Sequence, residues 1–332
     1  SCDSQPCRLQ FAAWLCSILV QSVAKTLGVR LHDARRMAHE ALHHFLRRIL
    51  SKYPIRFGAA AINRILDGAF GGSDANWLVA PSRGYFPTMV LDVSTNLQRK
   101  LFYFPRVYGR FYGTNTFAKF IRGRLKPGDT FYDIGANVGF FSLLAAGIVG
   151  DSGSVYAFEP EPVTCDSIAK SAKVNGYSRL HAVQCALSDH EGEADFYCAR
   201  DGTANSLVTE APGREKRYER KVTTRVTRLD NLVAEGTIDP RGLSLIKVDV
   251  EGAEARTVRG MRESLVAADY PAIWCEVRGP KGSTRAPNTY PAVLSVLKDM
   301  GYTPVIWSEQ GRRHVRDEDV VGRADVLFER SR

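Results

Sequence analysis

The pattern of apolar and polar positions divides the chain into two parts. From about residue 9 to residue 70, apolar residues such as Phe11, Trp14, Leu15 and Ile18 recur at mixed spacings of three and four, which is typical of amphipathic helices. From residue 130 to residue 329, short apolar runs alternate with helix-like segments. This alternation predicts an α/β fold with a doubly wound, mostly parallel sheet. We predict a helical N-terminal extension at residues 1–85 and an α/β domain at residues 86–332.

Seven apolar runs in the second part are predicted to be strands of the main sheet. They are Thr130–Ile134, Ser154–Phe158, Leu180–Ala186, Leu243–Val248, Ala272–Val277, Tyr302–Trp307 and Ala324–Glu329. Two further strands are predicted at Ala194–Cys198 and Lys221–Leu229. Helices are predicted between them at Pro162–Asn175, Ala253–Leu265 and Pro291–Met300. Upstream, the passage Gly71–Gly84 is rich in glycine, proline and serine and predicts a loop, and the alternation in Met89–Phe104 predicts a hairpin.

The segment Thr130–Gly147, TFYDIGANVGFFSLLAAG, predicts a strand, a tight glycine turn and a buried helix. Gly135 would let the backbone leave the strand in a conformation that a side chain forbids. Gly139 would let a ligand approach the helix N-terminus, where unpaired N–H groups favour electron-rich atoms. Asn137 stands where dinucleotide-binding turns of the G-x-G-x-x-G type have their second glycine, which disfavours NAD.

Acidic and polar residues follow the first three predicted strands of this domain. Asp133 lies at the carboxyl end of the first strand and is predicted to face a bound ligand. Glu159 closes the second strand, the usual place for a side chain that accepts hydrogen bonds from ribose hydroxyls. Ser188 and Asp189 follow the third strand, where an adenine would lie, although both are also ordinary turn formers. Together these residues predict a nucleoside site.

A second group of charged residues follows the strand Leu243–Val248. Lys247, Asp249 and Glu251 alternate, so they share one side while the strand continues. Glu276 lies near the end of the next strand, at the same edge of a parallel sheet. Because buried charges must be paired, so many charges at one edge predict a reaction centre. The alternative is a structural ion pair between Lys247 and one acid.

Composition narrows the class of protein only in part. The 332 residues have a net charge of +9 and are 44% hydrophobic, which predicts a sizeable core and favours acidic partners such as anionic glycans or membrane surfaces. We expect no nucleic-acid partner, because no sequence motif of such proteins is recognisable. Seven scattered cysteines indicate a reducing compartment, so we expect a cytoplasmic location. Polar residues interrupt the apolar stretch Leu9–Val20, so we expect no signal peptide.

One motif in the N-terminal part points to a metal. His39, Glu40 and His43 match the pattern H-E-x-x-H, which places two imidazoles one helical turn apart. A third ligand is not recognisable, and the surrounding RRMAHEALHHFLRRIL has the pattern of a basic amphipathic helix. A catalytic zinc also needs a cleft around it. We therefore predict no metal site and interpret both histidines as ordinary helix residues.

Five motifs, FYDIGANVGFFSLLAA, AFEPEP, CALSDHEG, LIKVDVEGAE and WCEV, together resemble the FkbM family of S-adenosylmethionine-dependent methyltransferases. The resemblance covers roughly Leu97–Phe328 and implies a seven-stranded, Rossmann-like methyltransferase sheet with a final antiparallel strand. It also implies that the methionine portion of the cofactor is held by Asp133, Gly135, Asn137 and Gly139, the ribose by Glu159, and the adenine by Ser188 and Asp189. Asp249 and Glu251 would border the reacting centre.

The resemblance implies methylation of a hydroxyl group, because known members act on sugars and polyketide-type natural products. Such a reaction needs an aligned hydroxyl and one base, for which Asp249, Glu251 and Glu276 are the candidates, with Lys247 beside them. The expected acceptor is a small molecule with hydroxyl groups, and the net charge favours an anionic one. The alternative function is a non-catalytic scaffold that docks a partner through the basic N-terminal helices. Those helices would also suit self-association or contact with a membrane surface.

Overall fold

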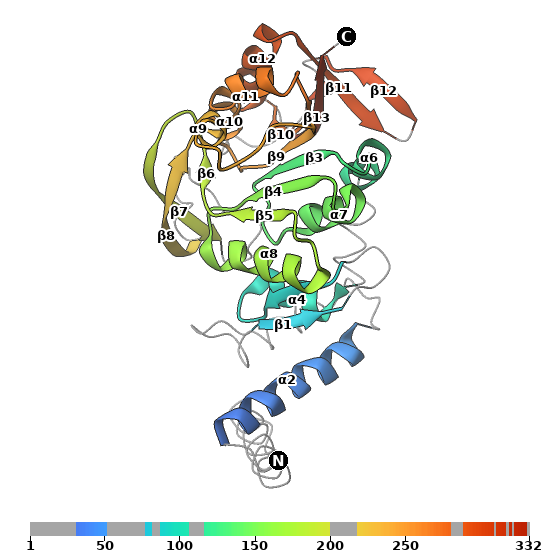
Figure 1. The fold of residues 1–332 in the computed structure, drawn as a ribbon, viewed down its shortest axis with the longest axis vertical. Helices are drawn as coiled ribbons and strands as arrows, with labels where there is room; N and C mark the ends of the chain where they lie inside the picture. The colour runs from blue at the N-terminus through green and yellow to red at the C-terminus, as the bar shows by residue number, and fades with distance from the viewer. Residues whose placement is uncertain are drawn as a thin grey trace.

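The structure is a computed structural model that describes residues 31–51, 77–81, 87–105, 116–199, 218–279, 288–308, 310–316, 319–320 and 322–330. Its centre is an eight-stranded sheet with the order β12-β11-β13-β10-β9-β3-β4-β5 (Figure 1). The strands are β3 (Thr130–Ile134), β4 (Ser154–Phe158), β5 (Leu180–Val183), β9 (Leu243–Val248), β10 (Ala272–Arg278), β11 (Tyr302–Ser308), β12 (Gly311–His314) and β13 (Arg323–Arg330).

Five neighbouring strands, from β5 to β10, run parallel, so their carboxyl ends lie at one edge of the sheet. Strand β13 runs antiparallel between β10 and β11. It therefore begins at the edge where the parallel strands end. This edge holds Glu159 after β4, Asp249 and Glu251 after β9, and Glu276 near the end of β10.

Successive side chains of the strands enter two separate cores, because both faces of the sheet are covered by helices. Phe131 packs into the core that contains residues of α6 (Thr116–Arg124), α7 (Phe140–Val149) and α8 (Pro162–Asn175). Tyr132, the next residue, packs into the core formed with α9 (Leu229–Ala234), α10 (Glu254–Arg259), α11 (Arg262–Ala267) and α12 (Tyr290–Asp299). A sheet buried on both faces explains the continuous apolar runs and confirms the predicted α/β class.

The strand count differs from the seven that the family resemblance implies. The additional strand, β12, has the sequence GRRH, and all four residues are exposed, so no apolar pattern could predict it. It pairs with β11 as a short antiparallel extension at the edge of the sheet. The predicted helix 253–265 is also interrupted, because Gly260 and Met261 separate α10 from α11.

A smaller three-stranded sheet with the order β6-β8-β7 lies beside the main sheet (Figure 1). It consists of β6 (Ala186–Leu187), β7 (Gly192–Ala199) and β8 (Tyr218–Thr227). Strand β6 follows β5 after a short connection but pairs with β8 instead of extending the main sheet. The single strand predicted over Leu180–Ala186 is therefore two strands in two sheets.

The segment before β3 differs from its prediction. Met89–Phe104 forms strand β2 (Met89–Asp92) and helix α4 (Asn96–Tyr103) instead of a hairpin. Strand β2 pairs with β1 (Trp77–Ala80), which lies in the passage predicted to be a loop. This pairing joins residues on both sides of position 85, and the domain boundary there stays a prediction.

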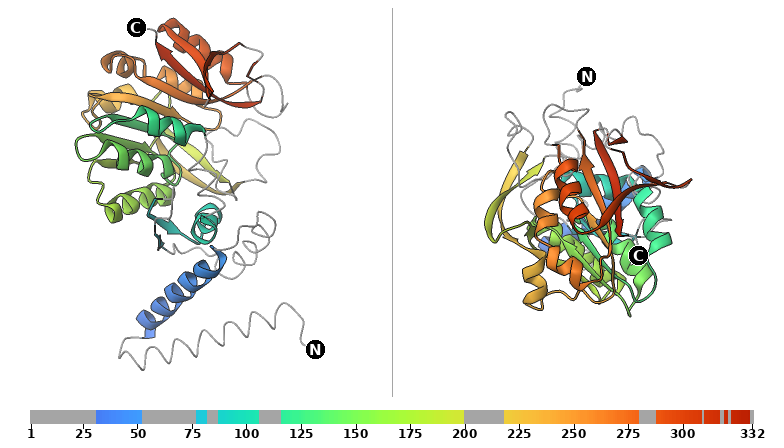
Figure 2. Two further views of the ribbon diagram at one scale, coloured as in Figure 1. Left: turned by 90° about the vertical axis from the view of Figure 1, so that its right-hand side faces the viewer. Right: turned by 90° about the horizontal axis from the view of Figure 1, so that it is seen from above.

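Helix α2 (Leu31–Leu50) lies beyond α4, at the end of the molecule opposite α12 (Figures 1 and 2). Its buried His43 makes a hydrogen bond through Nδ1 with the hydroxyl of Tyr103. The Nε of Arg47 donates a hydrogen bond to the carbonyl of Phe102 at 2.8 Å. No helix among the described residues is long and apolar enough to cross a membrane.

Gly139, the N-cap of α7, serves packing between helices. Its φ is +76°, and a Cβ at this position would lie 2.8 Å from a side-chain carbon of Ile168 in α8. The sequence-based expectation was that the absent side chain opens a path for a ligand. The structure corrects this, because the space that a Cβ would need is filled by Ile168 and not by a cavity.

We expect Gly139→Ala to destabilise the protein more than Gly176→Ala does. Both glycines have similar positive φ values, +76° and +71°, but a Cβ at Gly176 would meet nothing within 4 Å. Gly176→Ala should therefore cost only the backbone strain of about 1–2 kcal/mol, whereas Gly139→Ala should lose a further ~1–3 kcal/mol from overpacking against Ile168. Urea unfolding of both variants measures this difference, and equal losses would contradict the packing role.

Candidate active site

The turn after β3 and the loop after β9 lie in direct contact. The amide of Asp249 donates a hydrogen bond to the carbonyl of Ile134 at 3.0 Å. A Cβ on Gly135 would lie 2.0 Å from the carbonyl oxygen of Asp249, and Gly135 has a φ of +76°. The expected backbone role of Gly135 is thus confirmed, and the structure adds a second reason, the close approach of two chain segments.

A cavity of about 510 Å³ opens at the carboxyl edge of the sheet. One end is lined by the glycine turn, the end of β4 and the chain around β6, through Gly135–Val138, Phe158–Pro160 and Cys185–Leu187. The other end is lined by charged groups on or after β9, on β10 and on β13, which are Lys247, Asp249, Glu251, Glu276, Arg323 and Asp325. Three aromatic rings also line it, those of Phe117, Phe141 and Trp274. The two ends of the cavity therefore differ in chemistry.

Glu159 lies in the first end of the cavity and is held by the backbone. Its carboxylate accepts hydrogen bonds from the amides of Asn137 at 2.8 Å and Glu161 at 3.0 Å. Burial raises the pKa of Glu159 to about 7, although the two backbone hydrogen bonds oppose this shift. The fixed carboxylate, which still has lone pairs open to the cavity, fits the predicted role of ribose acceptor.

Asp133 is fully buried and does not line the cavity. Its Oδ2 accepts a hydrogen bond from the hydroxyl of Ser142 at 2.6 Å, and its Oδ1 lies 3.4 Å from the Nζ of Lys247. The sequence-based expectation that Asp133 faces the ligand is therefore corrected. The strand places its side chain behind the cavity wall, where it holds Lys247.

Lys247 connects the buried acid with the cavity. Its Nζ lies 3.3 Å from Oδ2 of Asp249, 3.4 Å from Oδ1 of Asp133 and 3.4 Å from the carbonyl of Gly135. Burial lowers the pKa of Lys247, but the charges of Asp249 and Asp133 outweigh burial, so the pKa is raised overall. Lys247 is thus a fixed cation that orients Asp249, and the structural ion pair that was the alternative reading is present as part of the site.

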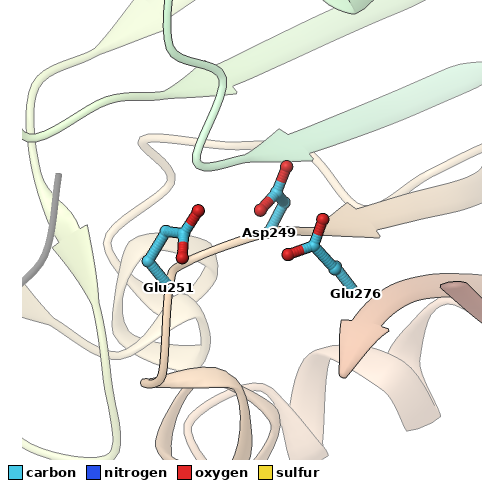
Figure 3. Close-up of side chains that lie close together, drawn as sticks. All are labelled: Asp249, Glu251 and Glu276. Atoms are coloured by element: carbon cyan, nitrogen blue, oxygen red, sulfur yellow. The ribbon is translucent and has the colours of Figure 1, made fainter. Parts of the chain in front are cut away.

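Asp249, Glu251 and Glu276 point toward one another at the second end of the cavity (Figure 3). One carboxylate oxygen from each lies within 4.8 Å of the others, a spacing that would also suit a cation. The protein supplies positive charge itself, since Glu251 pairs with Arg278 and Arg323, and the Nε of Arg323 lies 2.8 Å from Glu276. Glu251 also has a φ of +53°, a strained value for a residue with a side chain.

Glu276 has the properties of a proton acceptor. Its pKa is raised to about 8, mainly by burial and next by the charge of Asp249, while Arg323 opposes both effects. A carboxylate with a pKa near the working pH transfers protons more effectively than an ordinary one. Glu251, held between two arginines, is less suited to this task.

Ser188 and Asp189 do not line the cavity. Ser188 is buried, and its amide donates a hydrogen bond to the carbonyl of Thr227. Asp189 forms an ion pair with Arg259 at 2.7 Å. Burial raises the pKa of Asp189, but its hydrogen bonds with His190 and Arg259 outweigh burial, so the pKa is lowered overall. Because β5 ends at Val183, earlier than predicted, the residues that reach the cavity are Cys185–Leu187.

The sequence analysis missed Arg278, Arg323 and Asp325. Arg323 and Asp325 begin β13, which starts at the carboxyl edge because it runs antiparallel to β10. The polar alternation at the start of this strand, with apolar residues only afterwards, was a usable signal. His43 makes no metal cluster with other described residues; the side chain of His39 lies outside the described ones.

A doubly wound α/β sheet with a cavity at its carboxyl edge is the arrangement expected of an α/β methyltransferase. A sequence profile described as the methyltransferase FkbM domain matches residues 133–304. The chain belongs to this family.

The chain is similar to several individual proteins. The "31-O-demethyl-FK506 methyltransferase FkbM" of Streptomyces tacrolimicus is 29% identical over 209 residues, which are 54% of this chain and 75% of that protein. The "hexuronic acid methyltransferase AglP" of Haloferax volcanii is 28% identical over 145 residues, 43% of this chain and 54% of that protein. A solved methyltransferase FkbM from Methylobacillus flagellatus has a TM-score of 0.38 and 15% identity, covering 69% of this chain and 54% of that one.

The cofactor of the family is S-adenosylmethionine, and the residues of the first cavity end fit it. The carboxylate of Glu159 is fixed and faces the cavity, as a partner for ribose hydroxyls must be. Asn137 and the turn around it also line this end of the cavity. The acidic second end suits the positive charge of a sulfonium. Gly135, Asn137 and Glu159 therefore line the cavity, whereas Asp133 and Gly139 do not.

We expect the affinity for S-adenosylhomocysteine to rise between pH 6 and pH 8. With a pKa of about 7, Glu159 is mostly protonated at pH 6 and mostly ionised at pH 8, and the ionised form is the better hydrogen-bond acceptor. Glu159→Gln should weaken binding by about 1–3 kcal/mol and flatten the pH dependence.

Isothermal titration at three pH values measures both effects. The matched control is Glu235→Gln, a surface glutamate of similar size at the end of α9, which should behave like the unmodified protein. An unchanged pH dependence in Glu159→Gln would contradict the assignment of Glu159 to the ribose.

Proposed function

We propose that this protein is an S-adenosylmethionine-dependent O-methyltransferase that acts on a hydroxyl of a sugar or of a glycosylated or polyketide-type natural product. The observation that carries the proposal is the carboxylate cluster of Asp249, Glu251 and Glu276 at the end of the cavity next to the cofactor end. Carboxylates accept hydrogen bonds from hydroxyls and can take up a proton. These are the two tasks that methylation of a hydroxyl requires of the protein.

When bound, S-adenosylmethionine supplies an electrophilic methyl group, so the chain must orient the acceptor oxygen and receive its proton. Asp249, oriented by Lys247, is suited to position the hydroxyl. Glu276, with its raised pKa, is suited to accept the proton on a carboxylate oxygen. Glu251 and its two arginines form the fixed wall behind them.

The names of two relatives support this proposal. One is named for the 31-O position of a demethylated FK506 compound, which is oxygen methylation, and another for a hexuronic acid, which is a sugar. The alternative is a non-catalytic nucleoside-fold scaffold that docks a partner through its basic N-terminal helices. The raised pKa of Glu276 favours the enzyme, because a scaffold has no need of a buried carboxyl that ionises near neutral pH.

We expect the purified protein to transfer labelled methyl groups from S-adenosylmethionine to at least one member of a panel of glycosides and hydroxylated natural products. Asp249→Asn should retain most of the cofactor affinity, because its shape is nearly unchanged, and should lower turnover by ~10²–10⁴. The control is Asp299→Asn, an exposed aspartate at the end of α12.

Two outcomes would change the proposal. If no hydroxyl acceptor is methylated although the cofactor binds, the scaffold alternative is favoured. If Asp249→Asn turns over normally, positioning belongs to another residue of the cluster. Repeating the assay with a chelator tests whether the acidic cluster works without a divalent cation.

The assignment of the base to Glu276 predicts a pH profile. Because the base must be ionised, turnover should fall about tenfold per pH unit below the pKa of about 8 and level off above it. Asp249→Asn should move the profile to lower pH, since the charge of Asp249 raises the pKa of Glu276. Glu276→Gln should abolish the profile; a profile that persists in this variant would assign the base elsewhere.

A further inference from the structure

The charge of the cavity is opposite to the charge of the whole chain. The protein has a net charge of +9, yet five carboxylates and two cations line the cavity: Glu159, Asp249, Glu251, Glu276 and Asp325 against Lys247 and Arg323. Four of these acids lie at the end away from Glu159. The net basic charge therefore says nothing about what this cavity binds.

Strands β10 and β13 place like charges directly opposite each other. Glu276 pairs with Asp325, and Arg278 pairs with Arg323, so all four side chains leave the same face of the sheet. Like charges at directly opposed positions destabilise a sheet. Glu251 lies between the two arginines and pairs with both, so much of their positive charge is already used.

The opposed pair of Glu276 and Asp325 is left with an excess of negative charge. Arg323 contacts Glu276 through Nε, and Asp325 receives a hydrogen bond from Trp274. Burial raises the pKa of both carboxyls, and the charge of Asp249 raises both further. An anionic ligand placed here would meet the same repulsion, whereas a hydroxyl group would donate hydrogen bonds to these oxygens.

An apolar wall faces the carboxylates in the same end of the cavity. Phe117, Phe141 and Trp274 line it, and the rings of Phe117 and Trp274 lie 5.0 Å apart. Aromatic rings pack against the apolar face of a ring-shaped ligand while polar groups at its rim are fixed by hydrogen bonds. The combination fits a ring with hydroxyl groups at its rim.

We infer that the acceptor of this enzyme is an uncharged ring bearing hydroxyl groups, of the class of neutral glycosides, and that the acidic face of β10 and β13 discriminates against anionic sugars. The inference rests on the proposed function, because it concerns the acceptor end of the same cavity. It adds that the protein selects its acceptor by charge. This reverses the expectation of an anionic acceptor that follows from net charge, and it distinguishes this chain from the relative whose name contains a hexuronic acid, which is an anionic sugar.

A matched pair of probes isolates charge from shape. Methyl glucuronide carries a carboxylate, and methyl glucuronamide has nearly the same shape without the charge. At pH 9, where Glu276 with its pKa of about 8 is mostly ionised, we expect the amide to be methylated at low salt with a kcat/KM at least tenfold higher than that of the glucuronide. Raising the salt concentration from 50 mM to 500 mM should narrow this ratio, because screening weakens repulsion between charges.

Asp325→Asn should narrow the same ratio several-fold at low salt, since it removes one of the two opposed carboxylates. Asp299→Asn, which removes an exposed charge on α12, should leave the ratio unchanged. The readout is a ratio between two substrates of one variant, so a general loss of activity or stability in Asp325→Asn does not mimic the expected result.

A binding measurement separates the two proposals. Saturation-transfer NMR measures how each probe binds to the protein loaded with S-adenosylhomocysteine. If neither probe nor any other hydroxyl compound is methylated, the proposed function fails, but preferential binding of the amide still supports charge selection. If the glucuronide binds or reacts as well as the amide, or better, charge selection is overturned even though methyl transfer is established.

Discussion

The ammonium group of Lys247 is the interaction on which the site depends. It lies between the buried carboxylate of Asp133 and the cavity carboxylate of Asp249 and also contacts the carbonyl of Gly135. These residues belong to two adjacent strands and the turn after one of them, so one cation fixes the relative position of three chain segments. Replacing it with a neutral group would leave two carboxylates facing each other with little solvent between them, which is strongly unfavourable.

This arrangement also explains why the carboxyl edge of the sheet tolerates so many acids. Each of the three clustered acids has a cationic partner: Lys247 for Asp249, Arg278 and Arg323 for Glu251, and Arg323 again for Glu276. The partners hold the carboxylates in place. Burial and the charge of Asp249 together still raise the pKa of Glu276 toward neutrality, which is what a proton acceptor needs.

Much of the fold could be predicted from the sequence, because its main strands are buried on both faces and have continuous apolar runs. Thr130–Ile134, Ser154–Phe158 and Leu243–Val248 have the predicted bounds. The exposed strand β12 has no apolar pattern, and β1 and β2 are short and lie among turn residues, so local sequence did not reveal them. The grouping of charged residues at one edge of the sheet was also predictable, because the carboxyl ends of parallel strands meet there. The side-chain contacts of Asp133 and Asp189 were not predictable, because their partners Lys247 and Arg259 come from segments far away in the sequence.

In the proposed function, the mixed direction of the sheet separates the residues that would hold the cofactor from some of those that would contact the acceptor. The proposed cofactor end is formed by the turn after β3 and the segments after β4 and β5, while Arg323 and Asp325 come from β13, which has no part in that end. A slip of one residue in the pairing of β13 with β10 would turn both side chains to the opposite face and leave β3 and β4 undisturbed. A single strand near the C-terminus could thus be remodelled to change which acceptors are admitted, without rebuilding the part of the protein that holds the methyl donor.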